Sequence, residues 1–280
     1  MRINANAKIN LALDVTGKRA DGYHEVSMIM QEVGLCDKIE IIPDSTGEVK
    51  IEIKNANLPG DESNIAVKAA KLFFEKTSVK DGCKIILEKH IPICAGLGGG
   101  SSDGAAVLKG LNKIYDCPLG TDELCDLGLT LGADVPFFIE GKTALAKGVG
   151  EKLSKISSKL KGTLCIIKPD IDISTPLAYK ALDCCTYPHY DIIKIKEALE
   201  KGDTNTFINK SGNVFEYVCC PLHPQIDEIK NHLKKCGAYF AMMSGSGPSV
   251  FGIFEKSEDA KKAFETYKGS FGGGGVCELI

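Results

Sequence analysis

The 280-residue sequence has neither a long hydrophobic run nor a strong excess of charge. A membrane-spanning helix needs roughly 18 or more consecutive apolar residues, and no segment reaches that length. The formal net charge is −3, so electrostatics gives no reason to expect binding to nucleic acid or to an anionic membrane. The N-terminus has the pattern of a strand rather than of a signal peptide. We therefore expect a cytoplasmic protein with no nucleic-acid partner and no membrane partner.

Cysteine is abundant but lacks the spacing of a metal site. The twelve cysteines include no C-x-x-C pair, which argues against a zinc ribbon. Several lie in apolar segments, as Cys165 does, and we expect reduced, mostly buried thiols. Internal repeats are also missing. With 44% hydrophobic and 25% charged residues, the composition is that of an ordinary globular protein of one large or two average domains.

A glycine-rich segment is the most distinctive feature that is present. Residues 92–106 read PICAGLGGGSSDGAA, with four glycines in five positions and then helical apolar spacing. Ser101, Ser102 and Asp103 are candidate N-caps of that helix. A glycine loop that opens a helix offers unpaired N–H groups and a positive dipole end to a phosphate. The spacing matches neither a Walker A motif nor the dinucleotide fingerprint, so we predict another kind of phosphate nest; a flexible surface turn is the alternative.

The first residues of the chain predict a strand and a polar loop. Residues 2–16 alternate apolar and polar, which is typical of a half-buried strand, and place Lys8 and Asn10 on its polar face. Solvent exposure is the usual fate of such side chains, although asparagine is depleted from strands. The turn-rich residues 17–25 carry Tyr23 and His24, which could stack on and hydrogen-bond a planar ligand. A tyrosine packed on the surface is the alternative.

Asp134 stands alone between a predicted helix end and a very apolar run, residues 135–138. Buried aspartates are rare unless they are paired or functional. An aspartate after Gly-Ala also commonly caps a helix or a turn. The sequence leaves a functional carboxylate and a capping carboxylate equally open.

The second half of the chain has its own order of elements. A lysine-rich polar stretch near residues 154–162 suggests a boundary, and we divide the chain into residues 1–155 and 156–280. Predicted strands at 163–168, 238–243, 249–254 and 276–280, with helices between them, follow the β-α-β-β-α-β order of a ferredoxin-like domain. A second glycine-serine loop, Ser244–Pro248, lies between two of these strands. Two such loops suggest a phosphate-bearing ligand between the domains.

Five segments, in order, resemble the GHMP kinase superfamily. Residues 7–11, 92–106 and 243–252 are similar to its three general motifs, and residues 17–25 and 131–138 are similar to one member. The resemblance implies an α+β fold with an S5-like N-terminal domain and a ferredoxin-like C-terminal domain. It implies ATP and Mg²⁺ as cofactors, and phosphorylation of a hydroxyl on a small molecule that carries a cytidine diphosphate group, for isoprenoid precursor synthesis. The chain would act as a monomer or homodimer.

The resemblance also implies roles for single residues. Asp134 matches the catalytic base, and Lys8 matches the lysine that polarises the acceptor. Tyr23 and Tyr179 match the two rings that sandwich the cytosine, and His24 matches the residue that reads the edge of the cytosine. From its place at the helix start, Ser102 is a candidate for a direct or water-mediated metal contact, whereas Asp103 could equally be a simple cap. The residues expected to bind ATP are Pro92, Ala95, Gly96, Leu97, Gly98, Gly99, Gly100, Ser101, Ser102 and Asn64; those expected to bind substrate are Asn10, Tyr23, His24, Thr175, Tyr179, Gly245, Ser246 and Gly247.

Three other functions compete with this interpretation. Another GHMP kinase could act on homoserine, mevalonate or a sugar, but residues 21–24 suit a planar base and have no evident use for those acceptors. A non-catalytic nucleotide-binding relative would not need both Lys8 and Asp134. An RNA-binding S5-like protein fits poorly with a net charge of −3.

Overall fold

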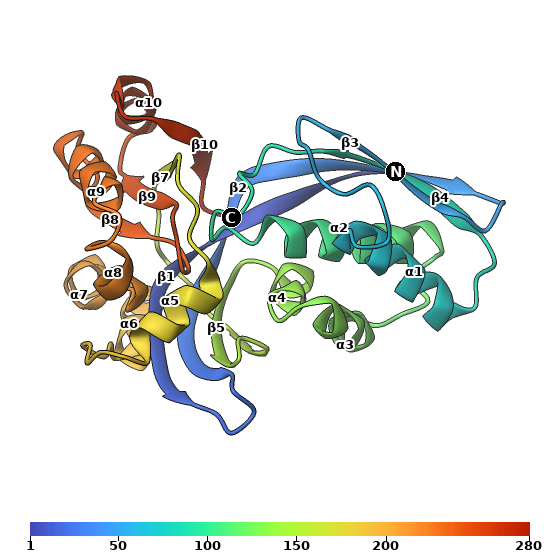
Figure 1. Ribbon diagram of the computed structural model, residues 1–280, viewed down its shortest axis with the longest axis horizontal. Helices are drawn as coiled ribbons and strands as arrows, with labels where there is room; N and C mark the ends of the chain where they lie inside the picture. The colour runs from blue at the N-terminus through green and yellow to red at the C-terminus, as the bar shows by residue number, and fades with distance from the viewer. The chain divides into compact units, whose positions relative to one another are not determined.

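The computed structural model describes residues 1–280 (Figure 1). Contacts divide the chain into two compact units that interleave along the sequence. Unit 1 comprises residues 1–7, 36–91 and 98–141, and unit 2 comprises residues 8–35, 92–97 and 142–280. The long strands β1 (Arg2–Lys18) and β2 (His24–Asp44) contribute residues to both units. The division at residues 155 and 156 follows the chain and stays a prediction. None of the helices has the length and hydropathy that a membrane span requires.

Unit 1 packs helices against a mixed sheet. Strand β4 (Gly82–Glu88) pairs antiparallel with residues 38–44 of β2 and parallel with β3 (Val49–Lys54). A Cβ built on Gly110 would lie 2.6 Å from Ile41 Cδ1, so the long helix of this unit lies directly on the sheet. The helices are α1 (Ile65–Thr77), α2 (Gly99–Ile114), α3 (Thr121–Leu131) and α4 (Val135–Glu140).

Unit 2 contains a four-stranded antiparallel sheet in the order β10-β7-β9-β8. With α9 and α10 packed against it, the chain order is β-α-β-β-α-β, and the predicted ferredoxin-like arrangement is confirmed. In the same unit, β5 and β6 extend from residues 26–31 of β2. The elements are β5 (Thr143–Gly148), β6 (Lys152–Lys155), β7 (Thr163–Pro169), α9 (Gln225–Lys235), β8 (Phe240–Met243), β9 (Val250–Phe254), α10 (Ser257–Thr266) and β10 (Phe271–Glu278).

Two features of unit 2 differ from the sequence-based expectation. The predicted β-α-β-β-α-β order has a single helix between its first two strands. Four more helices stand between β7 and α9, namely α5 (Thr175–Leu182), α6 (Ile192–Lys201), α7 (Thr204–Lys210) and α8 (Phe215–Cys219). The last two have 7 and 5 residues, too few to show a helical period. Strand β10 begins at Phe271 rather than Val276. Its first half is a run of glycines, which have no side chains to mark a strand in the sequence. Glycine is needed there, because a side chain on Gly274 would collide with the carbonyl of Ile166 in the neighbouring strand.

Strand β1 is not half-buried, as its alternation predicts, but buried on both faces from Ala7 to Val15. The polar side chains of Lys8, Asn10 and Asp14 are all covered. Residues 212–214 supply part of the cover: Leu13 N donates to Gly212 O at 2.9 Å, and Val214 N donates to Leu13 O at 3.1 Å. The polar residues between Ala7 and Val15 are therefore internal residues.

All twelve cysteines are free. The expectation that most of them are buried is wrong, because only Cys83, Cys165 and Cys219 are buried and four are exposed. Two of the exposed ones, Cys184 and Cys185, follow the end of α5, where the chain turns at the surface.

Candidate active site

The predicted phosphate-binding helix is α2, and it begins earlier than expected. Its N-cap is Gly98, with φ of 70°, so the proposal of an N-cap at Ser101–Asp103 is wrong. The first intrahelical bond runs from Ser102 N to Gly98 O at 2.9 Å. Because the cap has no side chain, no capping group covers the N–H groups of Gly99–Ser101. These three groups and the dipole of a 16-residue helix form an anion-binding end.

The first half of the glycine loop docks on the second glycine-serine loop within unit 2. Ser244 Oγ donates to Gly96 O at 3.0 Å, and Ser249 N donates to Ala95 O at 3.3 Å. Gly96 has φ of 72°, and a Cβ there would collide with Ser244 O. Only glycine fits at this position. The two loops that the sequence singled out are therefore in direct contact.

Strand β1 holds the glycine loop from the side. Lys8 N donates to Leu97 O at 3.0 Å. Ser102 Oγ, which is buried, donates to Asn6 O at 2.6 Å. The Ser102 hydroxyl hydrogen is thus committed to the strand, and the oxygen keeps its lone pairs for a hydrogen-bond donor or a metal.

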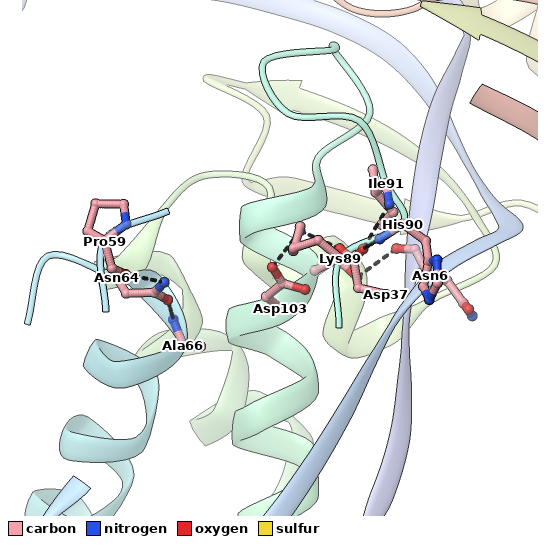
Figure 2. A network of polar contacts seen from close by, with 10 residues as sticks. Asn6, Asp37, Pro59, Asn64, Ala66, Lys89, His90, Ile91 and Asp103 are labelled. Carbon is pink, nitrogen blue, oxygen red and sulfur yellow. Dashed lines mark hydrogen bonds and ion pairs between the residues drawn. The ribbon is translucent and has the colours of Figure 1, made fainter. Parts of the chain in front are cut away.

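A buried ion network supports the start of α2 in unit 1 (Figure 2). The Lys89 ammonium lies between two carboxylates, hydrogen-bonded to Asp37 Oδ2 and, at 2.8 Å, to Asp103 Oδ2. Asp37 Oδ1 also accepts from the backbone N–H groups of His90, at 2.6 Å, and Ile91, at 2.8 Å. The network therefore joins the chain entering the glycine loop to the helix leaving it.

The two carboxylates of this network have unequal environments. Every oxygen of Asp37 has a partner, whereas Asp103 Oδ1 is buried without a hydrogen bond. Burial raises the pKa of Asp103 to about 7. The possibility that Asp103 is a simple cap is wrong, because its side chain bonds Lys89 rather than a backbone N–H.

Asp134 occupies the N-cap position of α4 but makes no capping hydrogen bond. The helix-cap interpretation of this carboxylate is therefore wrong, but Asp134 does lie in a turn, which Val135 N closes by donating to Gly132 O at 3.1 Å. A Cβ built on Gly132 would lie 3.9 Å from Ser101 Oγ, so the segment that leads into Asp134 lies beside the first turn of α2. Asn64, by contrast, does cap a helix: its Oδ1 accepts from Ala66 N and its Nδ2 donates to Pro59 O, both at 3.0 Å (Figure 2).

Lys8 and Asn10 form a buried polar pair in unit 2. Lys8 Nζ donates to Asn10 Oδ1 at 2.8 Å, and Asn10 Nδ2 contacts Met28 Sδ at 3.2 Å. A Cβ on Gly245 would lie 3.7 Å from Asn10 Oδ1, which places the pair next to the second glycine-serine loop. The solvated strand face considered above is excluded, since Lys8 is only 5% exposed.

The second glycine-serine loop is held by two other segments. Thr175, the first residue of α5, has its hydroxyl 2.7 Å from that of Ser246. Asn213 Nδ2 donates to the carbonyls of Met243, at 2.9 Å, and Gly245, at 2.8 Å. The predicted residues Thr175, Gly245 and Ser246 thus form one cluster with the buried Asn213.

The predicted base-binding rings come from two places, the turn between β1 and β2 with Tyr23 and His24, and α5 with Tyr179. The His24 ring stacks on Tyr179, with ring centroids 4.5 Å apart and an interplanar angle of 21°. Tyr179 in turn packs edge-on against Phe215. His24 Nε2 lies 2.7 Å from Asp183 Oδ1. Tyr23 is 66% exposed, so its part in a cytosine sandwich stays a prediction.

Sequence reasoning missed four residues of these clusters: Asp37, Lys89, Asp183 and Asn213. No local pattern marks them, because their partners are distant in sequence; Asp183 and His24 are 159 positions apart. No cluster of three His, Cys, Asp or Glu side chains could hold a metal by itself.

Comparison with known proteins defines the class. The GHMP kinases N terminal domain matches residues 64–142, and the GHMP kinases C terminal domain matches residues 195–272. The chain belongs to the GHMP kinase family and has its α+β fold. It is an ATP-using small-molecule kinase that phosphorylates an alcohol group.

Two similar relatives carry the name 4-diphosphocytidyl-2-C-methyl-D-erythritol kinase. The chain is 43% identical to that of Bacillus cytotoxicus, over 99% of this chain and 94% of the relative, and 42% identical to that of Exiguobacterium sibiricum, over 95% and 93%. A crystal structure of 4-(cytidine 5'-diphospho)-2C-methyl-D-erythritol kinase matches at TM-score 0.83 and 33% identity, over 99% of both chains. A homoserine kinase from Cytophaga hutchinsonii, at 20% identity and TM-score 0.73, shares the fold.

Proposed function

We propose that the chain phosphorylates the 2-hydroxyl of 4-diphosphocytidyl-2-C-methyl-D-erythritol with ATP, in non-mevalonate isoprenoid precursor synthesis in the cytoplasm. The observation that carries the proposal is the identity of 42–43% over almost the whole chain with kinases of that name. The predicted residues that lie together in each unit support it. The chain acts as a monomer or homodimer.

In the proposed reaction, ATP phosphates bind at the start of α2. The N–H groups of Gly99–Ser101 point to the γ- and β-phosphate oxygens, and the remaining ATP contacts come from residues 92–98 and Asn64. Mg²⁺ usually keeps waters and phosphates as ligands and takes only one or two from protein. A donor set of one hydroxyl, Ser102 Oγ, with no carboxylate cluster, fits a magnesium ion carried by ATP. When bound, such an ion would supply positive charge that offsets the charge on the transferred group.

Asp134 and Lys8 act on the acceptor. Asp134 accepts the proton as the O–H bond of the substrate breaks, the oxygen bonds to the γ-phosphorus, and ADP leaves. Lys8, anchored by Asn10, stabilises the charge that develops on the acceptor oxygen. Because phosphoryl transfer depends mainly on positioning and charge, buried and hydrogen-bonded side chains suit this role.

The cytidyl end of the substrate is bound by the turn between β1 and β2 and by α5. Tyr23 and Tyr179 stack on the base, and His24 hydrogen-bonds its edge. Thr175, with residues 245–247, binds the polar groups between base and acceptor. The existing hydrogen bond between Thr175 and Ser246 supports this grouping.

The test is ADP release measured by a coupled assay with the cytidyl substrate, mevalonate and homoserine in parallel. We expect turnover with the cytidyl substrate alone. Equal or faster turnover with either other acceptor would overturn the proposal. Asp134→Asn enzyme is the control, since it separates acceptor phosphorylation from background ATP hydrolysis.

A further inference from the structure

Asp183 contacts both Lys18 and His24, the residues of unit 2 at the two ends of the turn between β1 and β2. It follows α5, and its Oδ1 lies 2.7 Å from His24 Nε2, while its Oδ2 accepts a hydrogen bond from Lys18 Nζ. The hydrogen bonds from Lys18 and His24 hold the pKa of Asp183 below its ordinary value. At neutral pH the carboxyl is ionised, and an ionised carboxylate can only accept hydrogen bonds.

An acceptor at Nε2 decides the tautomer of His24. A neutral imidazole carries one N–H, and the other nitrogen presents a lone pair. Because Asp183 accepts at Nε2, that nitrogen carries the hydrogen. Nδ1 is left as a hydrogen-bond acceptor.

The His24 ring is also fixed in place. Its side chain is 10% exposed and stacks on Tyr179, which also makes a T-shaped contact with Phe215. Turning the ring over would put a C–H group against Asp183 and break the hydrogen bond. The orientation of Nδ1 is therefore set by the protein before any ligand binds.

We propose that Asp183 is a specificity-determining positioning residue, which holds His24 as the Nε2–H tautomer so that Nδ1 accepts from the 4-amino group of cytosine and repels the 4-oxo group of uracil. The inference rests on the proposed function, because it assumes that His24 meets the base. A polar group left facing a like group costs a site far more affinity than a missing contact. The predicted outcome is a preference for cytidyl over uridyl substrates.

The test compares the cytidyl substrate with its uridyl analogue at pH 8, where free imidazole is neutral. In Asp183→Asn enzyme the amide can accept or donate at Nε2, so both tautomers form. We expect the cytidyl-to-uridyl ratio of kcat/KM to fall about tenfold, mainly through the acceptor KM, with the ATP KM unchanged. Lys18→Met removes the other partner of Asp183 and leaves the His24 bond, so its ratio should equal that of the wild type.

A second measurement reads the tautomer directly. Comparing nitrogen-15 NMR spectra of the wild type and His24→Gln assigns the His24 signals. In the wild type they should show a protonated Nε2 and an unprotonated Nδ1. In Asp183→Asn they should show a mixture of the two tautomers. A protonated Nδ1 in the wild type, or an unchanged substrate ratio in active Asp183→Asn enzyme, overturns the inference alone. A wild-type enzyme that does not phosphorylate the cytidyl substrate overturns the proposed function instead, and with it the role of the tautomer in base selection.

Discussion

Asp37 and Asp103 both bind Lys89, but replacing each with asparagine should change the stability of the protein in opposite directions. Asp37→Asn keeps an oxygen for the backbone N–H groups of His90 and Ile91 but turns an amide N–H toward the Lys89 ammonium. Asp103→Asn removes a carboxylate whose Oδ1 has no hydrogen bond, while Lys89 keeps Asp37 as its counter-ion. The expected difference comes from which carboxylate neutralises the lysine.

The magnitudes typical of buried ion pairs set the scale. Leaving a buried charge without its partner costs about 3–5 kcal/mol, which we expect for Asp37→Asn. Asp103→Asn relieves the burial of a second carboxylate, and its amide oxygen can still accept from Lys89. We expect a change within about 1 kcal/mol, in the stabilising direction at pH 8.

The pH dependence follows from the same asymmetry. The pKa of Asp103 is raised from 3.8 to about 7 by burial, so between those values the folded state binds more protons than the unfolded state. Stability from this group is therefore present at low pH and is lost as pH rises toward 7. Asparagine does not titrate, so the stability of Asp103→Asn relative to the wild type should increase from pH 5 to pH 8.

Thermal unfolding followed by circular dichroism, at pH 5 and pH 8 and one scan rate, measures both effects. One kcal/mol corresponds to roughly 2–4 °C in a protein somewhat smaller than this one, so Asp37→Asn should lower Tm by about 6 °C or more. If Asp103→Asn lowered Tm at pH 8 as much as Asp37→Asn does, the unequal roles assigned to the two carboxylates would be refuted.

Three further predictions concern the candidate site. Asp134→Asn should lower kcat by about 10²–10⁴ because a general base is lost, with ATP binding by calorimetry nearly unchanged; near-normal turnover would contradict the role. Tyr23→Ala should raise the acceptor KM far more than the ATP KM, and equal increases would point to a structural tyrosine. Asn213→Ala leaves the carbonyls of Met243 and Gly245 without their donor and should destabilise the protein by about 1–3 kcal/mol in urea unfolding, whereas unaltered stability would show that water replaces the amide.

Local patterns were enough to predict much of the fold. The period of two in residues 2–16 and the helical period after the glycine loop follow from local side-chain spacing, and both elements are present as β1 and α2. The β-α-β-β-α-β order followed from counting such elements. The short helices α7 and α8 escaped because fewer than two turns cannot display a period.

Burial of polar side chains could not be predicted in the same way. Lys8 and Asn10 alternate with apolar residues as solvent-facing residues do, yet the second face of β1 is covered, in part by residues about 200 positions later in the chain. Lys89 and Asp37 likewise look like ordinary surface charges. Their role depends on a partner that only tertiary structure brings near, and a single sequence carries no record of that contact.

The glycine loop shows why a site can be recognised before its support is known. Binding phosphate with backbone N–H groups requires a run of residues without side chains, and this run is visible in the sequence. The same lack of side chains leaves the loop unable to fix its own shape. Its shape is instead held by Ser244 at Gly96, by the backbone of β1 at Leu97 and Ser102, and by the Asp37–Lys89–Asp103 network at both of its ends. Substitutions at Asp37 or Ser244, which carry no predicted contact with ATP, should therefore alter nucleotide affinity through the geometry of the loop, measurable as a raised ATP KM with an unchanged acceptor KM.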